Sequence, residues 1–323
     1  MNDLKSEPNL TPSAKRRRIS PWWSAAFLAS LFLLYGFRPD SAFAITVWPA
    51  WLGAGFGFLL SVFSRRLRGA LCLLWAVFVG VFVDEAKSLP RAILPAEMGQ
   101  FRVVTLNCAG GSESAAREVA RLKPDLVLFQ ESPSEVALRR IAKEVFGEEA
   151  SVHHGIDASI IAKGRLEKVQ EPRGVSDFVA ARWIPATGRS LQVVSLRLLP
   201  PVMRIDLYNP AAWSDFTTNR RARRDEAITM ATNFETIGIE PDLIGGDFNT
   251  PPDRSVLGAI VGSMDDVFAV AGVGLAATCV NPYPCIVRID QIWAGTVVRP
   301  VRAWVERTEN SDHRMLVADF RWR

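Results

Sequence analysis

The sequence predicts a layered α/β sandwich preceded by a transmembrane helical segment, on the basis of three observations. From residue 101 onward, short apolar runs typical of buried strands alternate with stretches of helical periodicity. Before residue 84, three apolar stretches contain almost no charged residues. Several predicted strands end in a carboxylate, amide or imidazole side chain, so the strand ends are candidate positions for a polar site.

Length and composition divide the chain into parts. Its 323 residues are enough for one large α/β domain and an additional segment. The hydrophobic content of 49% and the mean hydropathy of +0.11 are high for a water-soluble enzyme, and the excess lies before residue 90. We predict a basic cytoplasmic tail (1–20), a membrane segment of about three helices (21–83), a linker (84–100) and a folded domain (101–323).

The three apolar stretches cover residues 21–37, 42–63 and 69–83. A membrane span needs about 20 apolar residues, so the second fits best, while the other two are short. Basic residues at 15–18 and 65–68 favour a cytoplasmic N-terminus and a cytoplasmic second loop. The domain after residue 100 is then expected outside the cytoplasm. Tryptophans lie near the ends of the predicted spans, as in aromatic belts: Trp22, Trp23, Trp48 and Trp51.

Two other interpretations fit apolar stretches of this kind. A cleaved signal peptide would consist of the basic run, the first apolar core and a cleavage site at Ala42-Phe43-Ala44. Buried core helices would need a core to join, and the complete domain that follows leaves none. Multi-pass membrane anchoring is therefore the favoured interpretation.

Charge is distributed unevenly. Residues 1–100 hold 11 Lys and Arg against 6 Asp and Glu, whereas residues 101–323 hold 27 against 28. The domain thus lacks the basic footprint of a protein that follows a nucleic-acid backbone, so nucleic acid is not the favoured partner. A local basic cluster is either a solvated helix face or a substrate contact: Arg220, Arg221, Arg223 and Arg224.

In the first half of the domain, a strand is predicted over residues 101–107, and Pro124 ends a helix predicted over 113–122. The apolar run at 125–130 is typical of a buried strand. Val136, Arg140 and Ile141 stand at helical spacing and predict a helix over 134–146. Further strands are expected at 158–162, 178–183 and 191–196.

In the second half, Ile228, Ala231 and Phe234 lie on one side of a long helix predicted over 213–237. A strand at 242–246 leads to Asp247, and strands at 291–294, 301–305 and 315–320 complete the set. His153 and His154 are predicted loop residues, because they lack the spaced partners of a zinc site.

The cysteines give a partial indication of compartment. Cys279 and Cys285 bracket a Pro-rich loop and form either a disulfide, which would suit an extracytoplasmic domain, or two free thiols. Cys108 follows Asn107 directly and is predicted to pack in the core.

Seven polar residues stand at or near the ends of predicted strands: Asn107, Glu131, Asp247, Asn249, Asp290, Asp312 and His313. Carboxylate oxygens suit a hard divalent cation such as Mg²⁺. An aspartate and a histidine supply proton transfer and charge stabilisation. Together they predict a hydrolytic metal site.

These motifs resemble the endonuclease/exonuclease/phosphatase superfamily of Mg²⁺-dependent phosphoesterases, over roughly residues 101–323. The resemblance rests on Thr105-Leu106-Asn107, the run 128–132, the run 246–251, Ile289-Asp290-Gln291-Ile292 and Ser311-Asp312-His313-Arg314, in that order. It implies a four-layer fold, with two mixed β-sheets packed face to face under outer helices. One departure is clear: Arg197 stands where the family usually carries a histidine.

The resemblance also implies the metal and its ligands. Glu131 would be the principal Mg²⁺ ligand with Asp312 nearby, Mn²⁺ being an alternative cation, and Asn107 would position this cluster. Asn249 would hydrogen-bond the phosphate. Arg197 either clamps a phosphate oxygen or forms a structural salt bridge.

The remaining roles concern the reaction. Asp247 would orient or deprotonate the attacking water. Asp290 would hold His313 as an imidazolium that faces the phosphate. Asp247 and Asn249 also suit an ordinary turn, because both residue types favour such positions.

The sequence thus predicts a membrane-anchored Mg²⁺-dependent phosphoesterase whose catalytic domain faces away from the cytoplasm. Anchoring in the lipid bilayer favours a lipid-linked or head-group phosphate as substrate. Two alternatives are a metal-dependent nuclease of the same fold and a non-catalytic membrane receptor, which Arg197 motivates. The sequence gives no indication of oligomeric state.

Overall fold

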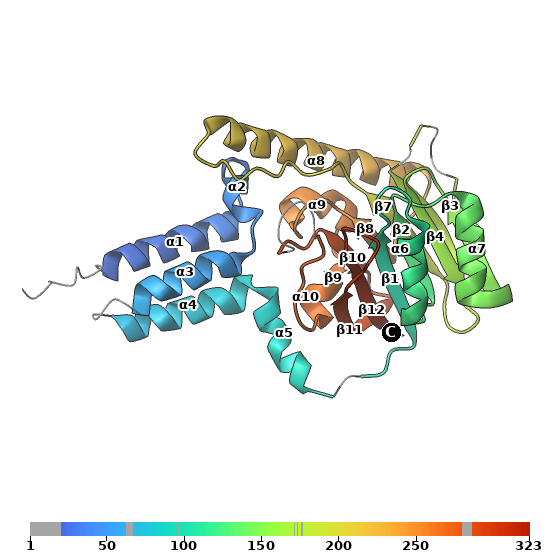
Figure 1. Cartoon of the computed structure of the whole chain (residues 1–323), viewed down its shortest axis with the longest axis horizontal. Coiled ribbons are helices and arrows are strands. Elements are labelled where there is room, and N and C mark those ends of the chain that lie inside the picture. Colours follow the sequence, from blue (N-terminus) through green and yellow to red (C-terminus); the bar gives the residue numbers. More distant parts are fainter. Residues whose placement is uncertain are drawn as a thin grey trace, which may run out of the picture.

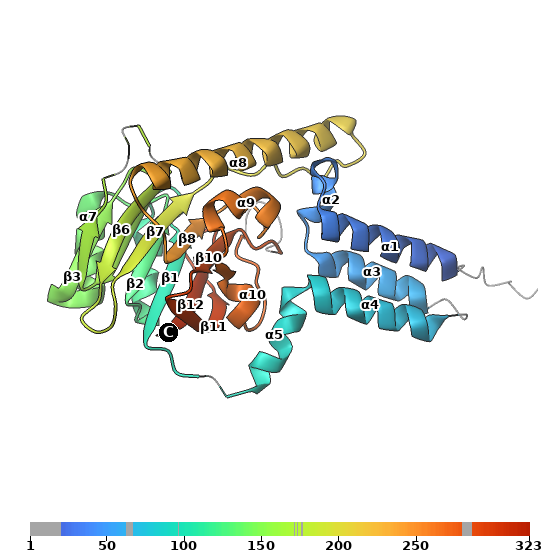
Figure 2. The same ribbon diagram turned by 180° about the vertical axis from the view of Figure 1, so that it is seen from behind.

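The computed structural model describes residues 21–62, 67–95, 97–170, 172, 174–175, 177–279 and 286–323. Three N-terminal helices lie side by side as a bundle, next to a two-sheet domain formed by the rest of the chain (Figure 1). The reverse view shows the same separation into bundle and domain (Figure 2). The bundle helices are α1 (Pro21–Phe37), α3 (Ala50–Val62) and α4 (Arg68–Phe82), and the short elements beside them are η1 (Asp40–Ala42), α2 (Phe43–Thr46) and α5 (Asp84–Ile93).

The apolar stretch 42–63, expected to be one membrane span, is broken. The helix pair Asp40–Thr46 and Ala50–Val62 bends by 72°. Pro49 lies in this break. It interrupts the helix, because proline has no N–H to donate and disfavours a helical conformation in the residue before it, Trp48. Helix α4 likewise meets α5 at 83°. In the described part of the chain, only these two bent pairs, and no single helix, combine the length and hydropathy of a bilayer span.

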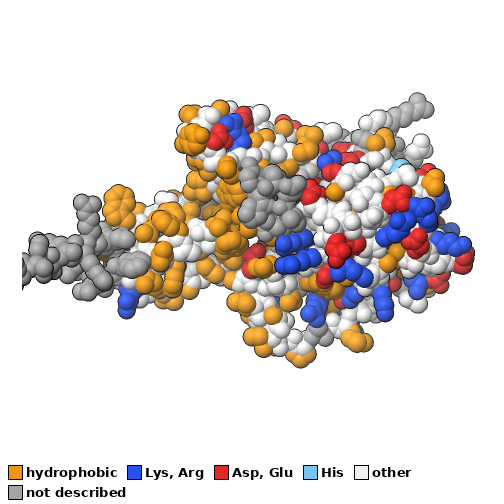
Figure 3. Space-filling model, viewed as in Figure 1, with side chains coloured by type: hydrophobic (Ala, Val, Ile, Leu, Met, Phe, Trp, Pro, Cys, Tyr) orange, Lys and Arg blue, Asp and Glu red, His pale blue; other side chains and the backbone are white. Residues whose placement is uncertain are grey.

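The bundle is apolar on its inner and outer faces. Trp75 and Phe78 are buried between the helices, and Gly57 leaves room for the Trp75 ring, which a Cβ at position 57 would meet at 1.9 Å. On the outside, hydrophobic side chains cover the visible face (Figure 3). The exposed side chains include Leu33, Phe37, Phe56, Leu59, Leu73 and Val77. A helix that is apolar all round is typical of a membrane segment or a deeply buried one.

The domain contains two six-stranded sheets. The first has the order β11-β12-β1-β2-β4-β3 and the second the order β5-β6-β7-β8-β10-β9. In each sheet one central pair, β1 with β2 and β7 with β8, is parallel, and the other pairs are antiparallel. The first sheet comprises β1 (Phe101–Asn107), β2 (Leu126–Gln130), β3 (Ala150–His154), β4 (Ala158–Lys163), β11 (Val298–Glu306) and β12 (Met315–Trp322). The second comprises β5 (Arg165–Lys168), β6 (Phe178–Ile184), β7 (Leu191–Arg197), β8 (Leu243–Asp247), β9 (Asp265–Asp266) and β10 (Asp290–Ala294).

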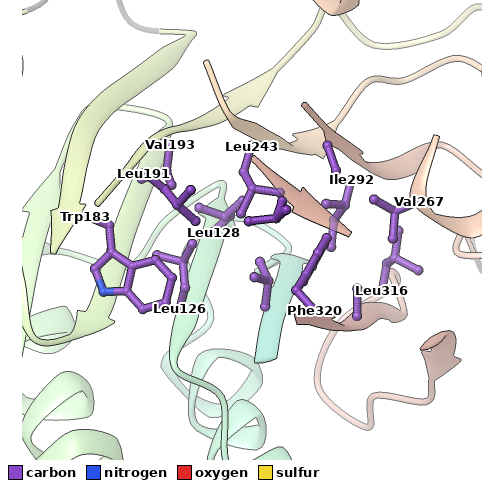
Figure 4. Close-up of a cluster of buried hydrophobic side chains, with 14 of the residues drawn as sticks. Leu126, Leu128, Trp183, Leu191, Val193, Leu243, Val267, Ile292, Leu316 and Phe320 are labelled. Carbon is purple, nitrogen blue, oxygen red and sulfur yellow. The ribbon is translucent and has the colours of Figure 1, made fainter. Parts of the chain in front are cut away.

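The two sheets pack face to face around one apolar core. Leu128, Val193 and Ile292 belong to this core, which Figure 4 shows in close-up. Separate clusters join the first sheet to α6 (Glu113–Arg117), η2 (Glu118–Leu122) and α7 (Glu135–Phe146), and the second sheet to α8 (Pro210–Thr236) and α9 (Arg254–Val261). Two shorter helices complete the domain: η3 (Gly147–Glu149) and α10 (Val267–Ala271). The predicted sandwich of two mixed sheets with outer helices is therefore confirmed.

Most predicted elements lie within a few residues of the observed ones. The helix expected over 113–122 divides into α6 and η2, and the expected linker 84–100 begins with α5. His153 and His154 were wrongly placed in a loop, since both lie in the edge strand β3, where His153 is buried. The pattern Ala-Ser-Val-His-His has too few apolar residues to indicate a strand.

Charged side chains join the N-terminal segment to the domain on two sides. Arg220 of α8 is buried and forms ion pairs with Asp40 at 2.9 Å and with Asp253 at 2.8 Å. On the other side, buried Arg288 bonds Asp84 at 3.0 Å and Asp266 at 2.7 Å. Neither interpretation of the basic cluster on α8 is therefore correct for Arg220, which fastens the N-terminal segment.

Two of the remaining arginines of that cluster also contact the N-terminal segment, and the third contacts the domain. Arg224 also pairs with Asp40, at 2.6 Å, and Arg221 lies 3.5 Å from the same carboxylate. Arg223 is buried and donates to the carbonyl of Leu199.

Candidate active site

The strand ends converge because of how the strands pair. Asn107 ends β1, and Glu131 follows the parallel neighbour β2. In the second sheet, Asp247 at the end of β8 is the register partner of Asp290 at the start of antiparallel β10. His313 precedes β12, which runs antiparallel to β1 and so begins where β1 ends. All these residues therefore lie at one edge of the sandwich.

Asn107 bridges the two sheets at this edge. Its side-chain amide donates to Glu131 Oε1 and to Asp247 Oδ2, both at 3.0 Å. The Gly110 N–H donates to the second oxygen of Glu131 at 2.6 Å. Glu131 itself has a φ of 45°, which is uncommon for a residue other than glycine. The carboxylate is thus held by Asn107 at the end of β1 and by Gly110 in the loop that follows β1.

Asp247, Asp290 and His313 form a buried cluster. His313 Nδ1 lies 2.9 and 3.2 Å from the two oxygens of Asp290, and His313 Nε2 lies 3.9 Å from Asp247 Oδ2. One ligand atom from each of the three residues lies within 4.8 Å of the others. The predicted pairing of Asp290 with His313 is therefore present, and the second ring nitrogen points toward Asp247.

Burial and neighbouring charges set the protonation of this cluster. Burial lowers the pKa of His313, but the carboxylates of Asp290 and Asp247 outweigh it and raise that pKa to about 10. Burial raises the pKa of Asp247 to about 6, although the charge of His313 opposes this rise. At neutral pH the pair therefore offers an imidazolium cation beside an ionised carboxylate that is close to its proton-accepting range.

In the metal-free protein, we expect His313 to remain protonated well above the ordinary range of histidine. Its ring resonances, followed by NMR, should titrate near pH 10, against an unperturbed pKa of 6.5. Asp290→Asn should lower this pKa, because it removes the largest favourable charge. The resonances of His154 serve as the internal control. Titration of His313 below pH 7 in the wild type would contradict the assigned geometry.

Arg197 belongs to an ion-pair network and not to a free surface. Its two terminal nitrogens lie 2.8 Å from Glu131 Oε1 and 3.0 Å from Asp157 Oδ2. Burial works to raise the pKa of Glu131, but the hydrogen bond from Asn107 and the charge of Arg197 hold that pKa below its usual range. Of the two interpretations of Arg197, the structural salt bridge is the one that the geometry supports.

Asn249 supports the turn that carries Asp247. The Asn249 N–H donates to Asp247 Oδ1 at 2.9 Å, and its side-chain amide donates to the Leu198 carbonyl at 2.7 Å. A contact from Asn249 to phosphate stays a prediction. Gly246 is needed by the sheet, because a Cβ there would meet the Leu196 carbonyl at 1.9 Å.

The donor set fits a hard divalent cation. Five carboxylates at this edge stand against two cationic side chains, Arg197 and His313, which leaves an excess of negative charge. The carboxylates are Glu131, Asp157, Asp247, Asp290 and Asp312. Glu131 carries ionised oxygens, the ligand type that Mg²⁺ prefers. In the structure these oxygens contact Arg197, Asn107 and Gly110, and Asp290 contacts His313. Asp312 is exposed, and its charge contributes to the raised pKa of His313.

Several supporting residues were not predicted from the sequence. The Thr278 hydroxyl accepts the N–H groups of Ile289 and Asp290, at 3.1 and 3.0 Å, and so fixes the start of β10. Ser311 donates its hydroxyl to the Asn107 carbonyl at 2.7 Å. No motif or spacing links Thr278 or Asp157 to the site.

Two of the predictions concern cysteines near the site. Cys108 is fully buried, and burial together with the charge of Glu131 raises the pKa of its thiol. It therefore packs in the core, as predicted. Cys285 lies outside the described residues, so the proposed pairing with Cys279 stays a prediction.

Comparisons with known proteins agree with this fold. A family model described as "Endonuclease/Exonuclease/phosphatase family" matches residues 104–313. A solved endonuclease/exonuclease/phosphatase from Bacteroides vulgatus is similar, with 17% identity, a TM-score of 0.52, and 69% of this chain and 99% of that chain covered. A mannosyl-6-phosphatase from Bacteroides thetaiotaomicron has 16% identity, a TM-score of 0.50, and coverage of 69% and 100%. No curated protein sequence matches the chain.

Proposed function

We propose that this chain, which belongs to the endonuclease/exonuclease/phosphatase family, hydrolyses a phosphate ester with the help of a divalent cation. Members of this superfamily are hydrolases that act on phosphate esters. The observation that carries the proposal is the convergence of Asn107, Glu131, Asp247 and His313 from both sheets at one edge. These residues supply a proton acceptor, a positive charge and a carboxylate ligand for a cation, which the attack of water on phosphorus requires.

Each side chain has a task in this proposal. Asp247, whose pKa is about 6, accepts the proton of the attacking water. The imidazolium of His313 stabilises the charge that develops on the phosphate oxygens, and Asp290 holds its ring in place. Asn107 keeps Asp247 and Glu131 at a fixed separation. Glu131, with Asp312 nearby, would hold the cation, which when bound supplies positive charge to the phosphate.

Metal dependence is the first test. The full-length protein should release phosphate or alcohol from at least one member of a panel of phosphomonoesters and phosphodiesters with Mg²⁺ or Mn²⁺, and chelator should abolish this release. Glu131→Gln should weaken the apparent affinity for Mg²⁺ by at least about tenfold, because it removes the charge of a direct ligand. Glu135→Gln, an exposed glutamate on α7, is the matched control. Wild-type protein that hydrolyses nothing in the panel would favour the receptor alternative.

We further propose that the N-terminal bundle anchors the enzyme in a membrane. The apolar outer face of α1, α3 and α4 supports this, since such a surface is unfavourable in water. The start of α1, the end of α3 and the start of α4 lie at the end of the bundle away from the domain (Figure 1). The basic residues at 15–18 and at 65, 66 and 68 belong to these two positions in the sequence, and Arg68 is the one among them that the structure describes. The catalytic domain would then face away from the cytoplasm.

Reporter fusions test this orientation. A reporter that is active only outside the cytoplasm should be active when fused after residue 100 and inactive when fused after residue 66. The opposite pattern would overturn the orientation. Activity at neither position, with all of the protein in the aqueous fraction, would overturn anchoring itself.

A further inference from the structure

We infer that the cleft between the helical bundle and the active-site loops binds the hydrocarbon chain of a lipid-linked phosphate ester, next to the reacting phosphate. The inference rests on the proposed phosphoesterase function and names its substrate class. It is carried by the position of the cleft, by its distance from the site and by the chemistry of its walls.

Both helix breaks line the same cleft. Trp48 and Pro49 of the first break and Val83 of the second form its bundle side, and Pro252 and Val287 belong to its domain side. The cleft has a volume of about 90 Å³. Since one water needs about 10–15 Å³ by this measure, the cleft has room for several non-hydrogen atoms. Within membranes, irregular backbone is tolerated where it lines a cavity, which gives these breaks a physical reason.

The domain wall of the cleft contains residues that are close to the active-site residues along the chain. Pro251 is two residues beyond Asn249, and Arg288 is two residues before Asp290. Because an extended chain covers at most about 3.6 Å per residue, the Cα atom of Pro251 lies within about 7 Å of that of Asn249, and the Cα atom of Arg288 within about 7 Å of that of Asp290. A phosphate at the active site and a chain attached to it can therefore occupy the site and the cleft together.

The walls combine apolar side chains with charged ones, which include Asp84 and Glu85. Tyr35, Trp48, Trp51 and Phe82 contribute aromatic surface. The arginines of the lining are engaged by protein: Arg288 pairs with Asp84 and Asp266, and Arg38 donates to the Pro252 carbonyl at 2.8 Å and lies 3.7 Å from Asp253.

The cleft also adjoins the apolar bundle. An alkyl chain in the cleft would therefore be shielded from water on the bundle side. Trp48 and Trp51 lie at the domain end of the bundle, and tryptophan is typical of the interface between membrane and water.

Binding of two non-hydrolysable phosphonates tests the inference on the full-length protein in nanodiscs with Mg²⁺. Dodecylphosphonate and ethylphosphonate share the charged group and differ only in chain length. We expect the wild type to bind the dodecyl compound at least tenfold more tightly. Trp48→Ala, which removes a wall, and Ala276→Leu, which fills the lining, should each reduce this ratio several-fold and leave ethylphosphonate binding unchanged.

Controls separate the cleft from the bilayer. Trp22→Ala changes an exposed tryptophan at the far end of α1 and should keep the wild-type ratio. Partition of the long chain into lipid is the same for all variants, so it cannot produce a difference among them. An unchanged ratio in both cleft variants would overturn the inference while the proposed function stands. Failure of the wild type to bind either phosphonate would overturn the proposed function and the inference with it.

Discussion

His313→Ala will lower kcat/KM for the phosphate ester by about 10²–10⁴-fold, the effect expected when a positioned charged group is removed from the reacting centre. The loss should fall mainly on kcat, because the imidazolium stabilises charge that develops only in the transition state. Its pKa of about 10 keeps the ring charged at neutral pH, so the loss should be large throughout that range. Steady-state kinetics at saturating Mg²⁺ measure the effect.

Two companion variants make this result interpretable. His313→Ala leaves the Asp290 carboxylate buried without its partner, so part of any loss could come from unfolding. His313→Gln keeps a hydrogen-bond donor toward Asp290 but carries no charge, and it should lose nearly as much activity while remaining folded. His154→Ala in β3 should retain wild-type kinetics. A folded His313→Gln variant with more than a tenth of wild-type kcat would contradict the assigned role.

Arg220→Ala will destabilise the protein by about 3–5 kcal/mol, the usual cost of removing one partner of a buried ion pair. The Arg220 side chain is 1% exposed and neutralises Asp253, whose side chain is 6% exposed, as well as Asp40. Its guanidinium also packs over the Phe43 ring at 4.8 Å. Thermal unfolding in detergent should show a decrease in Tm on the order of 10 °C.

Arg221 is a matched control for this prediction. It is the next residue on α8, lies 3.5 Å from the same Asp40, and has a side chain that is 66% exposed. Because surface ion pairs contribute little, Arg221→Ala should change stability by no more than about 0.5 kcal/mol. Equal decreases in Tm for the two variants would show that burial does not determine how much each arginine contributes to stability.

Much of the domain could be predicted because strands and their ends are local features. The apolar runs before Asn107, Glu131 and Asp247 correspond to β1, β2 and β8, and the polar residues stand where those strands end. The edge strands β3 and β5 were missed, because half-exposed strands have a weak apolar pattern. The uncharged run at 42–63 predicts a single span, whereas the structure has a break that contains Pro49.

By itself, the sequence determined the order of the polar motifs, the apolar N-terminal segment and the α/β class, since each follows from spacing along the chain. Only the tertiary structure decided which charges pair. Arg220 meets Asp40 across 180 residues, and Arg197 meets Asp157 across 40. Such partners are chosen by the packing of helices and sheets, because the free energy of a buried charge depends on what surrounds it and not on its neighbours in sequence.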